Sequence, residues 1–134
     1  MIVKLYYLKK GSRFYIEYIV HQCARGTYVP KKYHVQVLRW LGRYLKGTRD
    51  KGTILNPKMV KNIEVYVDAY FSGNWYQHDS LERGTKQSRY GYIIMYTRCP
   101  LVCKSQLQTG ITLSSTDSEY TGFSYALRKV ISIV

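Results

Sequence analysis

The chain has 134 residues, enough for one ordinary domain with or without a short additional segment. Its 21 Lys and Arg residues outnumber its 8 Asp and Glu residues, which gives a formal net charge of +13. A hydrophobic content of 46% argues against wholesale disorder. No apolar run approaches the roughly 18–20 residues of a membrane span, and the N-terminus lacks the pattern of a secretory signal. We therefore expect an intracellular protein, cytoplasmic or nuclear, that makes no membrane contact.

The cysteines are few and do not form a metal-binding pattern. Cys23, Cys99 and Cys103 are an odd number, and only the last two are closely spaced. A zinc site needs paired close spacings of Cys or His. We expect ordinary reduced thiols in a reducing compartment.

The positive charge is concentrated in the first half of the chain. Residues 1–61 contain 14 Lys and Arg but only two acidic residues, whereas residues 62–134 contain seven basic and six acidic residues. A basic surface attracts polyanions because phosphate contacts release counterions. The charge therefore favours a nucleic-acid partner, although a solvated basic face without a partner gives the same pattern.

Two helices are predicted in the basic half. Residues 13–25 have apolar positions at helical spacing, and Pro30 precedes a second such pattern over 31–46, with Gly47 as its expected end. The second pattern predicts an apolar stripe and a separate basic face. The stripe comprises Tyr33, Val37, Trp40 or Leu41, and Tyr44, and the basic face comprises Arg39, Arg43 and Lys46.

The second half is predicted to contain three strands and a helix. Alternating or β-branched residues predict strands over 63–68, 89–97 and 101–107, with 111–113 as a possible extension. Residues 72–88 are expected as a loop, Cys99-Pro100 as a turn, and a helix is expected to begin near residue 116. Short successive strands pair best in antiparallel fashion. The expected fold class is α+β, with a helical region over 1–58 and a second domain over 59–134.

Asp68 and Glu119 are the candidate site residues. Asp68 ends an apolar strand, where a carboxylate must be exposed, hydrogen-bonded or bound to a metal. Glu119 ends the sequence Thr116-Asp117-Ser118-Glu119, which matches a helix capping box and needs no other role. Alternatively, the two carboxylates share a cation, and hard oxygen ligands suit Mg²⁺.

Ordered sequence motifs favour a shared cation. NIEVYVDAYFSGNW, followed by SRYGY, CKSQLQ and LSSTDSEY, closely resembles the ribonuclease H domain of copia-type retrotransposon polyproteins. Upstream, VHQCARG and RYLKGT resemble the segment that joins the reverse transcriptase to that domain. The resemblance extends over nearly the whole chain, and several motifs in one order are more specific than any single motif.

The resemblance implies a fold, a reaction and a cofactor. The fold is ribonuclease-H-like, and the reaction is hydrolysis of the RNA strand of an RNA–DNA hybrid. Four carboxylates hold two Mg²⁺ ions in the family, and by motif position Asp68 and Glu119 match two of them. Both residues are therefore expected as catalytic residues and metal ligands, and Arg39, Arg43 and Lys46 as nucleic-acid contacts.

The sequence also departs from the family pattern. Tyr70 replaces a second aspartate, Tyr90 a threonine and Cys103 a tryptophan, and Gly110 and Gly122 replace larger residues. The other two carboxylates lie beyond the first helix in the family, and this sequence ends at Val134. The expectation is an incomplete, C-terminally truncated ribonuclease-H-like fold that binds Mg²⁺ weakly and cleaves little or nothing alone. The rest of the polyprotein or another chain would complete the sheet. The alternatives are a non-catalytic basic nucleic-acid-binding fragment and a decayed element without function.

Overall fold

The computed structural model describes residues 2–57, 59, 61–71 and 86–134. The chain divides into two compact units, Met1–Leu55 and Asn56–Val134. The first is helical, and the second is an antiparallel sheet with one helix, so the fold class is α+β as predicted. Most of the predicted loop over 72–88 lies outside the described residues, and the domain assignment over 1–58 and 59–134 stays a prediction.

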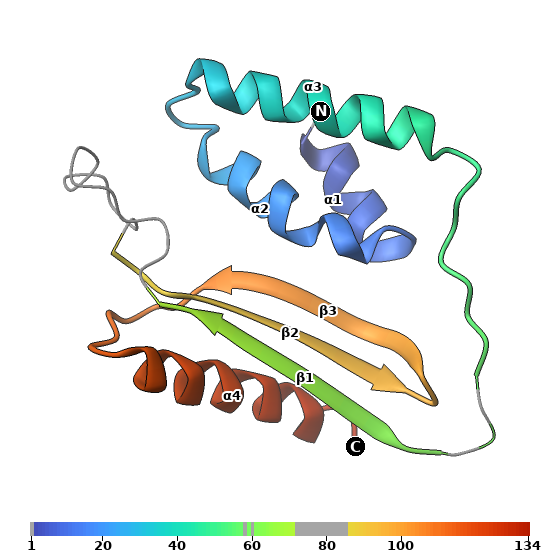
Figure 1. Cartoon of the computed structure of the whole chain (residues 1–134), viewed down its shortest axis with the longest axis vertical. Coiled ribbons are helices and arrows are strands. Elements are labelled where there is room, and N and C mark those ends of the chain that lie inside the picture. The colour runs from blue at the N-terminus through green and yellow to red at the C-terminus, as the bar shows by residue number, and fades with distance from the viewer. Residues whose placement is uncertain (1, 58, 60, 72–85) are drawn as a thin grey trace. The chain divides into compact units, whose positions relative to one another are not determined.

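The helical unit consists of three α-helices and a short 3₁₀ helix (Figure 1). These are α1 (Ile2–Gly11), η1 (Phe14–Ile16), α2 (Glu17–Arg25) and α3 (Lys32–Gly47). The predicted helices over 13–25 and 31–46 are confirmed, whereas α1 was not predicted. The core of the unit is formed by Leu5, Ile16, Val20 and Leu41.

A buried ion pair joins α1 to α2. The Lys9 ammonium lies 2.8 Å from the Glu17 carboxylate, and both side chains are largely buried. The same ammonium lies over the ring of Tyr6, 4.1 Å from its centroid. Because each charge has a partner, burial of this polar pair is tolerated inside an otherwise apolar contact.

Arg13 connects the start of η1 to the end of α3 through hydrogen bonds. Its guanidinium donates to the carbonyl oxygens of Thr48 and Arg49, at 2.5 and 3.4 Å. A cation is favourable there because the last carbonyl groups of a helix carry partial negative charge. The contact also fixes the neighbouring Tyr15 beside α3.

The second unit is a three-stranded meander in the order β1-β2-β3. The strands are β1 (Ile63–Tyr70), β2 (Arg89–Tyr96) and β3 (Cys99–Leu107), and all neighbours are antiparallel. In the described residues β1 pairs on one side only. Residues 111–113 do not extend the pairing, so that prediction is wrong.

The hairpin between β2 and β3 turns at Thr97 and Arg98, not at Cys99-Pro100 as predicted. Both residues have positive φ angles, 50° and 67°, as a two-residue hairpin turn of the right twist requires. Pro100 instead lies within β3, beside a register shift between Ile94 and Met95. A bulge accommodates proline because the ladder is already interrupted there.

Helix α4 (Ser115–Ile131) covers one face of the sheet. Its buried residues Ser118, Gly122 and Ala126 are spaced by one turn, so they form a narrow contact strip. The strip packs against alternate residues of β1 and against Tyr90 and Ile94 of β2. Gly122 permits this approach, because a Cβ atom there would lie 3.1 Å from the Cβ of Tyr90.

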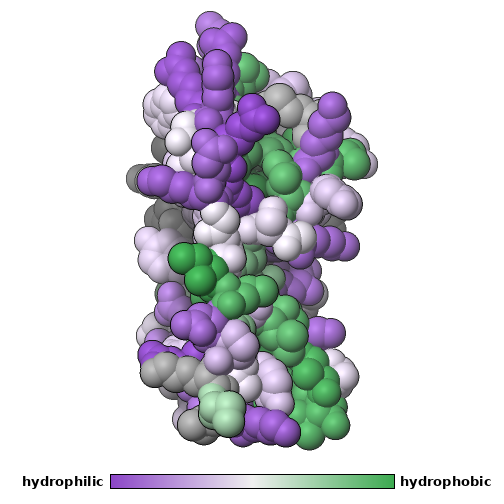
Figure 2. Space-filling model, turned by 90° about the vertical axis from the view of Figure 1, so that its right-hand side faces the viewer, coloured by the Kyte–Doolittle hydropathy of each residue, from purple (hydrophilic) through white to green (hydrophobic). Residues whose placement is uncertain are grey.

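Hydrophobic side chains also remain on the surface, where Figure 2 shows them as green areas among hydrophilic ones. On α4 they form a stripe that faces away from the sheet contact, formed by Tyr120, Phe123, Leu127 and Ile131. Such a stripe is typical of a surface that contacts further protein.

None of the described helices is both long enough and apolar enough to cross a bilayer.

Candidate functional site

Asp68 lies near the carboxyl end of β1, opposite Gly91 of β2. Val65, Val67 and Ala69 pack into the core beneath α4, so the alternating Asp68 side chain lies on the other face of the strand. The side chain is exposed, and it makes no hydrogen bond or ion pair within the described residues. Because it is exposed, this carboxylate carries no desolvation cost that would require a structural partner.

The cap of α4 differs from the predicted one. Ser114 is the N-cap residue, and its hydroxyl accepts a hydrogen bond from the backbone N–H of Asp117 at 3.1 Å. The Asp117 carboxylate accepts in turn from the backbone N–H of Leu113, also at 3.1 Å. The predicted capping box of Thr116 and Glu119 is therefore wrong by two positions. Glu119 is exposed and takes no part in capping.

Glu119 lies on the β1 side of α4. Tyr125 marks the other side, because its ring stacks on Tyr90 at 4.7 Å and its hydroxyl contacts Thr109 after β3. Helix residues advance by about 100°, so Glu119 is displaced from the central Gly122 by about 60° in the direction opposite to Tyr125. Figure 1 shows that α4 begins at the end of the sheet where β1 finishes. Asp68 and Glu119 thus belong to the same end of the unit.

The two carboxylates are not joined by any contact. Asp68 lies on the face of β1 that is turned from α4, whereas Glu119 lies on the β1 side of that helix. Among the described residues, no group of three His, Cys, Asp or Glu side chains is arranged to hold a metal ion. Two carboxylates alone would not be a complete donor set for the implied Mg²⁺ ions. The role of this pair as metal ligands stays a prediction.

A polar cluster holds the beginning of α4 against the sheet. The Gln108 side-chain amide donates to the Ser118 carbonyl oxygen at 2.7 Å, and the backbone N–H of Gln108 donates to the Ser88 carbonyl at 2.8 Å. The Ser88 hydroxyl lies 2.6 Å from that of Thr112, and Ser88 is completely buried. Ser88, the serine of the SRYGY motif, therefore has a structural role.

The predicted basic face is present on α3. Arg39, Arg43 and Lys46 are all exposed, and none has an ion-pair partner within the described residues. The predicted apolar stripe is also present on α3, but most of it is not buried. Leu41 is buried with Leu38 and Leu45 packed around it, whereas Tyr33, Trp40 and Tyr44 are each about half exposed. Three aromatic positions of the predicted stripe therefore lie at the surface.

Comparison with known proteins identifies relatives among mobile elements. The chain is 30% identical over 105 residues to the retrovirus-related Pol polyprotein from transposon RE1 of Arabidopsis thaliana. It is 29% identical over 105 residues to that of transposon RE2 from the same plant. Each match covers 78% of this chain but 7% of the relative's length. No family model and no solved structure matches.

The matches agree with the motif order found in the sequence. The chain belongs with the copia-type retrotransposon polyproteins and corresponds to a short segment of one.

Proposed function

We propose that the sheet unit is the first part of a ribonuclease-H-like domain, and that Asp68 and Glu119 belong to its nuclease site. The ancestral reaction is Mg²⁺-dependent hydrolysis of the RNA strand of RNA–DNA hybrids, inside the cell during reverse transcription. The observation that carries the proposal is that Ser114 and Asp117 cap α4, so that Glu119 takes no part in capping. It leaves two exposed carboxylates at one end of the unit, on adjacent elements, with no structural task within the described residues.

The proposal assigns only a share of the chemistry to this chain. Bound Mg²⁺ ions would supply an activated water and stabilise the leaving oxygen. Asp68 and Glu119 supply two of the family's four carboxylates, and a strongly hydrated cation needs more negative charge or substrate phosphates. We expect weak Mg²⁺ binding and little or no hydrolysis by the 134 residues alone. A further polyprotein segment, or another chain, would pair with β1 and add the remaining carboxylates.

An end-labelled RNA–DNA hybrid tests this proposal. The chain is extended with the segment that follows the matched stretch in the RE1 polyprotein, and cleavage is measured in Mg²⁺. The extended chain should cleave the RNA strand, and Asp68→Asn or Glu119→Gln should abolish cleavage. Glu64→Gln is the matched control, because Glu64 is another acid on β1 that matches none of the family's four carboxylates, and it should retain activity. No cleavage by the extended chain, or equal cleavage by Asp68→Asn, would contradict the proposal.

A second candidate is non-catalytic nucleic-acid binding by the helical unit. It is favoured by the exposure of Arg39, Arg43 and Lys46 on one face of α3, with no acid paired to them in the described residues. Exposed cations in this arrangement bind the phosphate backbone of a nucleic acid without sequence specificity. In that case an RNA–DNA hybrid is held but not cut, and binding weakens steeply with salt.

A further inference from the structure

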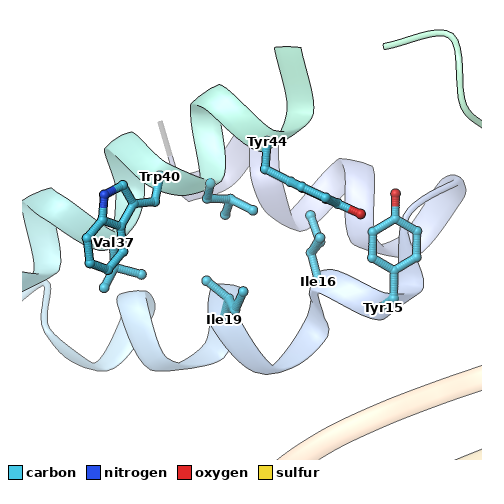
Figure 3. Close-up of a pocket in the computed structure, with 7 residues that line it drawn as sticks. Tyr15, Ile16, Ile19, Val37, Trp40 and Tyr44 are labelled. Atoms are coloured by element: carbon cyan, nitrogen blue, oxygen red, sulfur yellow. The ribbon is translucent and has the colours of Figure 1, made fainter. Parts of the chain in front are cut away.

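The helical unit contains an open groove between α3 and the η1–α2 segment. Its volume is about 340 Å³, within the range of pockets that bind small ligands. Tyr15, Ile16 and Ile19 form one wall, and Val37, Trp40 and Tyr44 form the other (Figure 3). All of these residues belong to the unit Met1–Leu55, so the groove is complete within it.

The aromatic walls are exposed although the unit has an apolar core of its own. Trp40 is 58% exposed, Tyr44 49% and Tyr15 44%. Leu41 and Ile16 fill the core behind them, so the three rings are not needed to close it. Large rings that remain on the surface in one groove are available for contact with a flat apolar partner.

Two of the rings are fixed in place. Tyr15 and Tyr44 meet edge to face, with centroids 6.3 Å apart, and Figure 3 shows their hydroxyl groups directed toward each other. A hydrogen bond between these hydroxyls raises the pKa of Tyr44, which favours its neutral form. Arg13 donates to the Tyr15 hydroxyl and holds the end of α3. The groove is therefore preformed, and less conformational entropy is lost when a ligand binds.

Positive charge borders the groove. Successive residues of α3 are rotated by about 100° around the helix axis. Arg43 is therefore about 60° from Trp40 around this axis, on the side away from the buried Leu41. Arg39 follows on the same side, and both arginines are exposed. Of the two acidic residues in this unit, Glu17 is neutralised by Lys9, and Asp50 lies beyond the end of α3. Rings flanked by exposed cations suit a ligand that combines a flat apolar ring with negative charge.

We propose that this groove binds an unpaired base of single-stranded nucleic acid, with Trp40 as the stacking platform and Arg39 and Arg43 on the flanking phosphates. Stacking tolerates any base, because every base has an aromatic face. Paired bases of a hybrid cannot enter, so the groove distinguishes single strands from duplex. This site goes beyond the proposed nuclease chemistry and does not depend on Asp68 or Glu119.

Fluorescence of the full chain tests the proposal. The sequence has two tryptophans, so Trp75→Phe leaves Trp40 as the single reporter. A twelve-residue oligouridylate should quench Trp40, and a blunt RNA–DNA hybrid of equal length should not. In anisotropy titrations at fixed salt, Trp40→Ala should weaken binding of the single strand by about five-fold or more, the loss expected from one stacked base.

Controls separate stacking from unfolding. Tyr28→Ala removes a ring that is 97% exposed in the same unit but outside the groove, and it should leave binding unchanged. Trp40→Phe keeps an aromatic face and should retain most of the affinity, which a misfolded variant would not. Equal affinity of Trp40→Ala and Tyr28→Ala, or no quenching by the single strand, would overturn the proposal. Dissociation of a dimer by Trp40→Ala without an effect on oligouridylate binding would assign the groove to a second copy instead.

Discussion

The Ser114 hydroxyl caps α4 by accepting a hydrogen bond from the backbone N–H of Asp117 at 3.1 Å. Ser114→Ala should therefore lower the free energy of unfolding by about 1 kcal/mol, because a donor at the helix start loses its partner. Thr116→Ala removes the hydroxyl of the cap expected from the sequence and should cost less. Urea denaturation of both variants measures the difference. A larger loss for Thr116→Ala would place the cap at Thr116.

Two glycines in helices should respond in opposite ways to substitution. Gly122 lies against Tyr90 and Ala69, so Gly122→Leu should destabilise the protein by about 1–3 kcal/mol through overpacking. Gly42 in α3 is open, because a Cβ atom added there would meet, apart from its own helix turn, no atom of the described residues within 4 Å. Gly42→Ala should therefore stabilise the protein by up to about 1 kcal/mol. Thermal unfolding followed by circular dichroism checks both. Destabilisation by Gly42→Ala would show that this helix face is covered.

Loss of the Lys9 ammonium should be costly. Lys9→Ala leaves the Glu17 carboxylate largely buried without its cation, which we expect to lower the free energy of unfolding by about 3 kcal/mol. Lys10→Ala changes an exposed neighbour and should stay within about 0.5 kcal/mol of the parent. Chemical denaturation compares the two variants. Equal effects would mean that the ion pair does not hold α1 on α2.

Tyr90 should limit stability at alkaline pH. Burial, with smaller contributions from Tyr92 and Tyr125, raises its pKa to about 12 from an ordinary value of 10. As the pH rises, the unfolded chain therefore loses the Tyr90 proton before the folded chain does. The contribution of Tyr90 to the free energy of unfolding is complete below pH 10 and is lost as the pH rises from about 10 to about 12. Tyr90→Phe should keep its stability to higher pH than the parent. Tyr7→Phe, at an exposed site, is the control, and an equal alkaline midpoint for all three proteins would contradict the prediction.

Salt dependence should report the basic face of α3. Conversion of Arg39, Arg43 and Lys46 to glutamine should flatten the slope of log affinity against log salt for an RNA–DNA hybrid. The decrease should approach about 0.9 for each phosphate contact that is lost. Conversion of Arg128 of α4 to glutamine serves as a control outside this face. An unchanged slope in the triple variant would show that the hybrid contacts a different surface.

The sequence predicted most elements because their patterns are local. The strands around Val65 and Ile94 alternate or are β-branched, and α3 has helical periodicity. Helix α1 was missed because its burial depends on Lys9, which a hydropathy pattern assigns to solvent. The ion pair with Glu17, eight residues later, and the contact with the Tyr6 ring allow Lys9 to be buried. Local pattern does not report such tertiary compensation.

The candidate site residues could be predicted from sequence motifs, whereas their structural surroundings could not. Asp68 and Glu119 were found because they belong to ordered motifs. The position of the cap at Ser114 and the outward position of Trp40 depend on how the elements pack, which periodicity leaves open. Two departures from the family also gain a structural explanation. Tyr90 is larger than the usual threonine, and it packs against Gly122, which is smaller than the usual residue there.

Mn²⁺ titration followed by NMR shows whether Asp68 and Glu119 act as one cation-binding pair, on which the proposed nuclease site depends. With an RNA–DNA hybrid present to supply phosphates, Mn²⁺ should broaden the amide signals around both residues at the same concentration. Asp68→Asn should weaken the broadening around Glu119 as well as around residue 68, whereas Glu64→Gln should not. Broadening near Glu119 that is unaffected by Asp68→Asn, or no selective broadening at either residue, would contradict a shared cation.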